Sequence, residues 1–283
     1  MRKRYAAALL FVVCASGGAA SQHAESGRTY PDASAFFQKV REATRLDYEL
    51  QSEFSYREER RDVRISRLGK VEIGVLRTFE VFPSSVPGRT YKRLIAVNGV
   101  PLSADELARR DREHQNNLEN QRAQQSRETP QDRKERLEKE AEALAERNAI
   151  LDDALAVFQG TFIGRETIDG ATVYVLSVTP REDARVRTRE GRWLKSFAGT
   201  VWITADDYQI VKLDMRARGD VSIGWGILGR VHEGSRFVFA RRRFDGAWLP
   251  SQVIFDATGR TLLFRKFDLD LVTTYSGYKR VGQ

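Results

Sequence analysis

Two stretches of this chain alternate apolar and polar residues with a period of two, and this alternation constrains the fold more than any other feature. The first stretch follows Glu53 and contains runs at Phe54 to Tyr56, Val71 to Val81 and Tyr91 to Val97. The second follows residue 160 and contains six runs: Thr172 to Thr179, Gly199 to Thr204, Tyr208 to Arg216, Arg236 to Phe244, Trp248 to Phe255 and Thr261 to Val272. The pattern predicts about ten strands, which is a large number for one open sheet.

Short turn sequences separate these runs and decide how the strands connect. They are Gly69-Lys70, Pro83 to Gly88, Asn98-Gly99, Asp169-Gly170, Asp206-Asp207, Asp245-Gly246 and Thr258-Gly259. Such turns join antiparallel neighbours and leave no room for parallel crossovers. A sheet this wide is expected to curl or partly close. We therefore predict an α+β fold, with a curled antiparallel sheet in the form of a half-open barrel, an N-terminal helix and an inserted helical hairpin.

Two segments have a helical period instead. The first begins at Pro31-Asp32 and places Phe36, Phe37, Val40, Ala43 and Leu46 three to four residues apart, with Asp32 or Ser34 as the N-cap. Its apolar face is expected to lie on the sheet.

The second helical segment is an insert, Ser103 to Phe158, between the two strand-rich stretches. Ser103 and Glu106 form a capping-box pattern, and Pro130 divides the segment into two helices. The second helix carries a stripe that must pack on something: Leu137, Ala141, Leu144, Asn148, Leu151, Leu155 and Phe158. The first helix has only Leu107, His114 and Leu118 along one line, so it is predicted to be a solvated, mobile arm. Residues 32–100 and 160–275 are then two halves of one β domain, and residues 103–158 are the insert.

The first twenty residues have the three-part layout of a secretory signal. Arg2, Lys3 and Arg4 precede an apolar run from Ala6 to Val13 and a small, polar stretch from Ala15 to Ser21. Cleavage is predicted after Ala20, with Ala24 as the second choice, so residues 1–20 are expected to be removed and the product to be periplasmic. Lipid attachment at Cys14, the single cysteine, is not expected, because Val13 stands where a small residue is required.

The formal net charge is +8 at pH 7. This surplus favours anionic lipid headgroups, a membrane surface or an acidic envelope protein as partners, and nucleic acid is not expected outside the cytoplasm. The three histidines, His23, His114 and His232, fit no catalytic or metal-binding spacing. We predict no catalytic residue, no metal site and no cofactor, so the chain is predicted not to be an enzyme.

One Gly-rich stretch contains Gly224, Gly226 and Gly229 in the spacing of a dinucleotide-binding loop. The flanking runs predict antiparallel strands, whereas that loop requires a strand before it and a helix after it. The stretch is more informative as an apolar loop that guards the mouth of a cavity or touches a membrane, through Ile223, Trp225, Ile227 and Leu228. The alternative is that these side chains cover the end of the core.

The stretch Gly199-Thr-Val-Trp-Ile-Thr-Ala-Asp-Asp-Tyr-Gln-Ile-Val-Lys-Leu-Asp resembles the strand, turn and strand unit of the LolA-like periplasmic lipoprotein carriers, which share a fold with LolB and RseB. The N-terminal helix, the first strands and Trp248-Leu249-Pro250 also fit. The resemblance covers about residues 32–100 and 160–275. It implies a half-open barrel closed by helices on one face, with a cavity that takes acyl chains.

A wide curled sheet leaves inward side chains that either meet covering helices or enclose a ligand. The candidate ligand-binding positions are Phe54, Tyr56, Phe79, Val81, Val211, Leu213, Met215, Phe237, Phe239, Val253 and Phe255. For each of them, plain core packing is the alternative. Two non-enzymatic interpretations follow. The first is a binding or carrier protein for lipid, lipoprotein acyl chains or another apolar ligand, and the second is an envelope interaction or sensing module that uses the helical insert. An enzyme is the third interpretation.

Overall fold

The computed structural model describes residues 30–66, 70–83, 90–223, 229–261 and 265–281 of the 283-residue chain. Four helices are described: α1 (Ala33–Gln51), α2 (Ala104–Ser126), α3 (Pro130–Val157) and α4 (Arg189–Leu194). The strands before the insert are β1 (Phe54–Ile65), β2 (Val71–Phe82), β3 (Tyr91–Val97) and β4 (Val100–Pro101). Those after it are β5 (Phe158–Ile168), β6 (Ala171–Pro180), β7 (Phe197–Thr204), β8 (Ile210–Ala217), β9 (Val221–Ile223), β10 (Gly229–Val231), β11 (Arg236–Phe244), β12 (Ala247–Arg260) and β13 (Lys266–Arg280).

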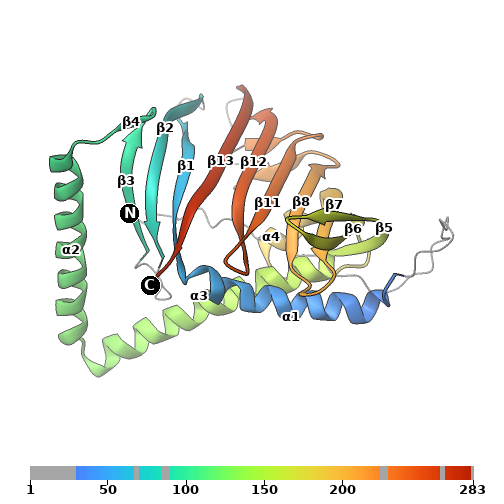
Figure 1. The fold of residues 1–283 in the computed structure, drawn as a ribbon, viewed down its shortest axis with the longest axis horizontal. Helices are drawn as coiled ribbons and strands as arrows, with labels where there is room; N and C mark the ends of the chain where they lie inside the picture. The colour runs from blue at the N-terminus through green and yellow to red at the C-terminus, as the bar shows by residue number, and fades with distance from the viewer. Residues whose placement is uncertain (1–29, 67–69, 84–89, 224–228, 262–264, 282–283) are drawn as a thin grey trace.

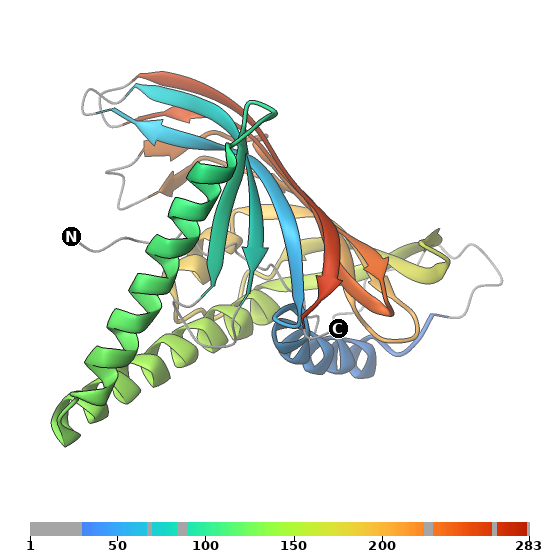
Figure 2. The same ribbon diagram turned by 60° about the vertical axis from the view of Figure 1, so that its left-hand side comes forward.

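All described strand pairs are antiparallel and belong to one 13-stranded sheet. The order along it is β4-β3-β2-β1-β13-β12-β11-β8-β7-β6-β5; off this path, β10 pairs with β12, and β9 pairs with β10. The last strand, β13, pairs with both β12 and β1, so the strands before and after the insert form a single sheet. The sheet is strongly bent, as Figure 2 shows, and it is open because β4 and β5 are its two edges. The predicted α+β fold with a curled antiparallel sheet is confirmed.

The strand order also explains the path of the insert. The chain leaves the sheet at one edge, β4, and returns at the opposite edge, β5, after α2 and α3. Figure 1 shows α2 on the β3 side of the sheet and α3 running from the end of α2 along the bottom of the view toward α1. The two helices must bridge the full width of the sheet because the strands on either side of them are its two borders.

The helix boundaries follow the capping signals in the sequence. The Ser103 hydroxyl accepts from the Glu106 N–H at 3.2 Å, and a second capping box at Thr129 starts α3 with Pro130 in the first turn. Pro130 therefore begins a helix instead of interrupting one. At α1, an Asp32 carboxylate oxygen accepts from the Ala35 N–H at 2.8 Å, as predicted for an N-cap.

Three predicted turns have the backbone conformation that their sequences indicate. Asn98-Gly99, Asp169-Gly170 and Asp245-Gly246 each combine two positive φ values, as a two-residue hairpin turn requires. The predicted turn at Thr258-Gly259 is wrong, because both residues lie inside β12. A Cβ on Gly259 would lie 2.2 Å from the Arg230 carbonyl oxygen, so this glycine permits the close approach of β10 and does not mark a turn.

The prediction of about ten strands was too low. No predicted run covers β5 (Phe158–Ile168), whose first residue was assigned to the insert. The prediction also missed β4, β9 and β10, which have two or three residues each and show no period. The short helix α4 was also missed. The short strands and α4 depend on contacts with residues distant in the sequence, so no local sequence pattern predicts them.

Candidate functional site

The register of the sheet defines one continuous concave face. Residues paired across antiparallel strands point to the same side. The pairs Glu58↔Phe79, Glu58↔Tyr275, Phe255↔Leu271, Phe237↔Phe255 and Phe237↔Met215 therefore carry one face from β2 across to β8. The same face continues through Val201 and Leu176 to Phe162 on β5.

Helices cover one half of this concave face. The main core packs α1 and the C-terminal part of α3 against β5 to β8 and β11. Its members include Phe36, Phe37, Val40, Leu155, Phe158, Leu176, Leu213, Met215 and Phe239. Phe237 and Val253 lie at the border of this core and are partly buried. The sequence prediction that the apolar face of the N-terminal helix lies on the sheet is confirmed.

The other half of the concave face lies over β1, β2, β12 and β13. Its apolar and aromatic side chains are neither fully buried nor fully exposed; we call this set the open half, and it comprises Tyr56, Phe79, Val253, Phe255, Leu271 and Tyr275. Tyr56 packs edge-on against Tyr275, with ring centroids 5.9 Å apart, and against Tyr278 at 5.4 Å. Aromatic side chains that stay partly exposed on a concave surface offer a contact area for an apolar ligand.

A charge cluster crosses the open half between these rings. Glu58 is 3% exposed and accepts from Lys92 Nζ at 2.6 Å, and Arg60 Nε lies 3.2 Å from the other Glu58 oxygen. Asp62 continues the line, 3.5 Å from Arg60 Nε and paired with Arg77. The Arg60 guanidinium also lies over the Phe79 ring, 5.5 Å from its centroid. The cluster thus places cationic side chains beside the aromatic surface.

The tyrosine hydroxyls of this region stay protonated over a wide pH range. Burial raises the pKa of Tyr275 to about 12, and the Glu58 carboxylate adds to the effect. Burial, followed by Glu58, also raises the pKa of Tyr56, and burial raises the pKa of Tyr278. The hydroxyls of Tyr56 and Tyr275 are consequently hydrogen-bond donors under ordinary conditions.

A test of this environment is an alkaline titration. An acid whose pKa is raised on folding stabilises the folded state fully below the unfolded pKa, here 10.0, and that stabilisation is lost as pH rises toward about 12. We expect the free energy of unfolding to fall over this range, with part of the tyrosinate absorbance appearing only on unfolding. If all tyrosines ionise near pH 10 while far-ultraviolet circular dichroism remains native, the described burial is wrong.

Helix α3 presents an apolar line next to this region. Leu137 and Leu155 are about five helical turns apart, so they lie on the same side of the helix. Leu155 is fully buried in the core, whereas Leu137 is 50% exposed and Leu144 is 48% exposed. Of the predicted stripe, only the C-terminal part is packed, and Leu137, Ala141 and Leu144 are exposed toward the α2 end of the helix.

Helix α2 contacts the opposite, convex face of the sheet edge. Tyr91 and Arg93, which alternate with Lys92, donate to Asp111 at 2.8 and 2.6 Å, and Tyr91 stacks on His114 at 3.9 Å. Burial opposes ionisation, but the hydrogen bonds from Tyr91 and Arg93 outweigh it and lower the pKa of Asp111. No residue of α2 is buried.

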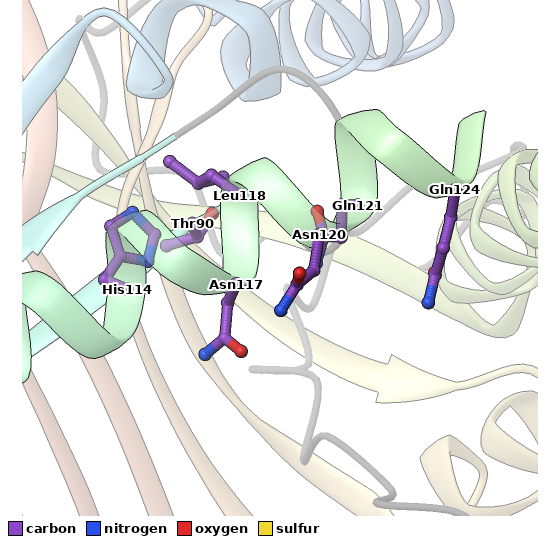
Figure 3. Close-up of a pocket in the computed structure, with 7 residues that line it drawn as sticks. All are labelled: Thr90, His114, Asn117, Leu118, Asn120, Gln121 and Gln124. Carbon is purple, nitrogen blue, oxygen red and sulfur yellow. The ribbon is translucent and has the colours of Figure 1, made fainter. Parts of the chain in front are cut away.

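Two described cavities border α2. One of about 380 Å³ is lined by Thr90 and by polar side chains of the helix, among them His114, Asn117 and Gln121 (Figure 3). The other, of about 500 Å³, includes Phe82, Tyr91 and Arg93. Figure 3 shows Asn117, Asn120 and Gln124 extending to a different side of the helix from Leu118, so these groups do not converge on one point.

The structure brings most predicted ligand-binding residues onto the concave face but divides them. Leu213, Met215 and Phe239 belong to the helix-covered core, and Phe54 is fully buried in a separate cluster with Ala247 and Leu249. Val81 is also fully buried, but it lies opposite Tyr56 on the same face as the open half. Tyr56, Phe79, Phe237, Val253 and Phe255 are partly buried and lie in or beside the open half. Val211 is separate: a bulge in β8 places it with Trp202 and Trp248 in another cluster.

The remaining predicted site lies at the Gly-rich loop. Trp225, Ile227, Leu228 and the side chain of Ile223 fall outside the described residues, as does the whole predicted signal sequence. Two residues of the open half were not predicted from the sequence, Leu271 and Tyr275. The charged residues beside it, Glu58, Arg60 and Lys92, were not predicted either. Glu58 and Arg60 could have been found by continuing the alternation of Phe54 and Tyr56 along β1, without requiring an apolar residue at each step.

Among the described residues, no group of three or more His, Cys, Asp and Glu side chains is arranged to hold a metal ion. None of the helices in the described part of the chain has the length and apolar character needed to cross a bilayer. His114 and His232 are partly exposed and lie far apart in the sequence, with His232 Nδ1 3.1 Å from an Asp220 oxygen.

Comparison with known proteins gives three similar solved structures. A DUF1329 family protein from Desulfovibrio piger has 13% sequence identity and a TM-score of 0.30, with 88% of this chain and 93% of that chain covered. A LolA superfamily protein from Nitrosomonas europaea has 12% identity and a TM-score of 0.28, with 87% and 94% covered. MucB in complex with MucA(peri) has 12% identity and a TM-score of 0.23, with 89% and 100% covered.

No family model and no curated protein matches the sequence. One of the three structures, the LolA superfamily protein, bears the name of the group that the sequence resembles. The three TM-scores are too low to carry an argument about function, so the function is argued from the site itself.

Proposed function

We propose that this chain is a non-enzymatic binding or carrier protein of the periplasm, which holds the acyl chain of a lipid or lipoprotein, or another apolar ligand, between its curved sheet and its helices. The observation that carries the proposal is the division of the concave face. One half is a closed core under α1 and α3, whereas the open half keeps six large side chains partly exposed. Apolar area removed from water contributes roughly 25 cal/mol per Å², so an extended hydrocarbon tail would gain substantially by covering this surface.

The arrangement of α3 supports the same proposal. Its exposed leucines, Leu137 and Leu144, continue the line that packs on the sheet at Leu155. The helix also runs between the two edges of the sheet, on the path that the strand order imposes. The exposed leucines of α3 therefore offer further apolar surface that a long tail can cover.

Paired substitutions on β2 test the proposal. Phe79 lies in the open half, whereas Phe82 lies on the opposite face, where it stacks on Tyr91. We expect Phe79→Ser to weaken the binding of dodecanol by roughly tenfold, because burial of an aromatic side chain contributes about 1.5–3 kcal/mol. Phe82→Ser should leave the affinity unchanged. Isothermal titration calorimetry measures both, and equal losses in the two variants would contradict the proposed site.

A second candidate function has its own observation. Helix α2 has 23 residues and no buried side chain, which is unusual for a helix kept only as part of a core. This exposure favours an envelope interaction or sensing module that binds a protein through the insert. If this second function holds, the double variant Asn120→Glu and Gln124→Glu should abolish binding of the protein partner. The affinity for dodecanol should not change in either case, because neither residue lies in the open half.

A further inference from the structure

We propose that the ligand carries an oxyanion, a carboxylate or a phosphate, and that Arg60, Lys92, Tyr56 and Tyr275 bind this group while the tail lies on the open half. The inference rests on the proposed function and adds the chemical class of the ligand's polar end. It predicts that ligands whose only polar group is neutral or cationic bind less tightly than those with an oxyanion.

The four side chains share one place on the concave face. Tyr56, Glu58 and Arg60 alternate along β1 and point to the same side, and Lys92 reaches Glu58 from β3. Tyr275 is directly opposite Glu58 on β13, with its ring 5.9 Å from Tyr56. The Arg60 guanidinium lies over Phe79, so the polar groups adjoin the surface proposed for the tail.

Hydrogen-bond donors exceed acceptors in this cluster. Arg60 Nε lies 3.2 Å from Glu58 Oε1 and 3.5 Å from Asp62 Oδ1. Both Arg60 Nε and Glu58 Oε1 are buried without a hydrogen-bond partner among the described residues, so the guanidinium keeps donors for a ligand. Lys92 uses one contact, to Glu58 at 2.6 Å, which leaves donor capacity on its ammonium group. Within the same part of the chain, the hydroxyls of Tyr56 and Tyr275 have no hydrogen-bond partner either. The forked terminal nitrogens of an arginine match the geometry of a carboxylate or phosphate.

The charge balance points the same way. Among the described residues, Arg60, Arg77 and Lys92 are paired with two carboxylates, Glu58 and Asp62, so this cluster has a positive surplus before a ligand binds. A cationic ligand would be repelled by this surplus. A neutral hydroxyl could accept hydrogen bonds, but it would gain nothing from the charge, whereas hydrogen bonds to a charged group are about twice as strong as neutral ones.

Ligands with one tail and different heads test the inference by isothermal titration calorimetry. We expect dodecanoate and dodecyl phosphate to bind the wild-type protein roughly tenfold or more tightly than dodecanol. Arg60→Gln should weaken the binding of dodecanoate and dodecyl phosphate far more than the binding of dodecanol, and so remove most of this preference. Arg61→Gln is the matched control, because Arg61 follows on the same strand, faces the other side and contacts the Gly74 carbonyl. The double variant Tyr56→Phe and Tyr275→Phe keeps the rings and is expected to reduce the preference without removing it.

The outcomes separate this inference from the function on which it rests. Equal affinities for all three ligands in the wild-type protein, or equal weakening of dodecanoate and dodecanol by Arg60→Gln, would overturn the inference and leave the carrier proposal standing. Binding of none of the three would overturn the carrier proposal. A preference for dodecanoate over dodecyl phosphate supports a fatty-acid carboxylate as the source of the oxyanion, and the reverse supports a phospholipid phosphate. Thermal unfolding of Arg60→Gln at the wild-type temperature verifies that the variant is folded.

Discussion

Replacing Asp153 by alanine is expected to lower the free energy of unfolding by about 3 kcal/mol. Asp153 lies near the end of α3, is 4% exposed, and accepts from the backbone N–H groups of Arg187 and Thr188 and from the Thr188 hydroxyl at 2.5 Å. The same hydroxyl accepts from the Gly191 N–H at 3.0 Å and caps α4. Alanine would leave these donors buried without an acceptor, at about 1–3 kcal/mol each before relaxation.

Urea unfolding at constant m-value measures this loss. Glu142→Ala, on an exposed position of the same helix, is the control and should change stability by no more than about 0.5 kcal/mol. Asp153→Asn should cost less than Asp153→Ala because one acceptor oxygen remains. A loss below 1 kcal/mol for the alanine variant would show that Asp153 does not join α3 to α4 in solution.

Gly199→Ala is expected to be at least as damaging, with a loss of about 3 kcal/mol or more. Gly199 lies in β7 opposite Met215, and a Cβ there would stand 2.0 Å from the Asp214 carbonyl oxygen and 2.8 Å from the Met215 Cα. Both are backbone atoms of β8, so the strand itself must move. Since β7 and β8 form the floor of the helix-covered core, that movement would also disturb the packing of Leu213 and Met215.

Gly164→Ala is the matched control for this prediction. Gly164 is also a strand glycine, beside the bulge of β5, but an added Cβ meets nothing within 4 Å. Chemical denaturation should place this variant within about 0.5 kcal/mol of wild type. Similar behaviour of the two alanine variants would mean that the close approach of β7 and β8 is not as described.

Local sequence patterns predicted most of the fold because the signals were local. The alternation in β6, β11 and β12, the Asp-Gly and Asn-Gly turns and the capping box at Ser103 each depend on neighbouring residues only. Gly259 was predicted to lie in a turn, but a glycine is needed there because the backbone of Arg230, distant in the sequence, passes close to it. In a sequence, a glycine that permits such a close approach cannot be told from a turn glycine.

The site was less predictable for two physical reasons. Bulges change which face a residue occupies, and the extra residue in β8 moved Val211 away from Leu213 and Met215. A search for apolar inward positions also omits charged ones, so Glu58 and Arg60 were not considered although they alternate with Tyr56. Which half of the concave face the helices cover depends on the strand order, and no local pattern reveals that β13 joins β1.

Native mass spectrometry of the protein purified from its native host without detergent tests the central claim most directly. If the open half of the concave face holds an apolar tail, the protein should carry an additional mass that organic extraction removes and identifies as an acyl-chain compound. Repeated preparations at the mass of the bare chain, which also fail to take up added dodecanol, would contradict the account.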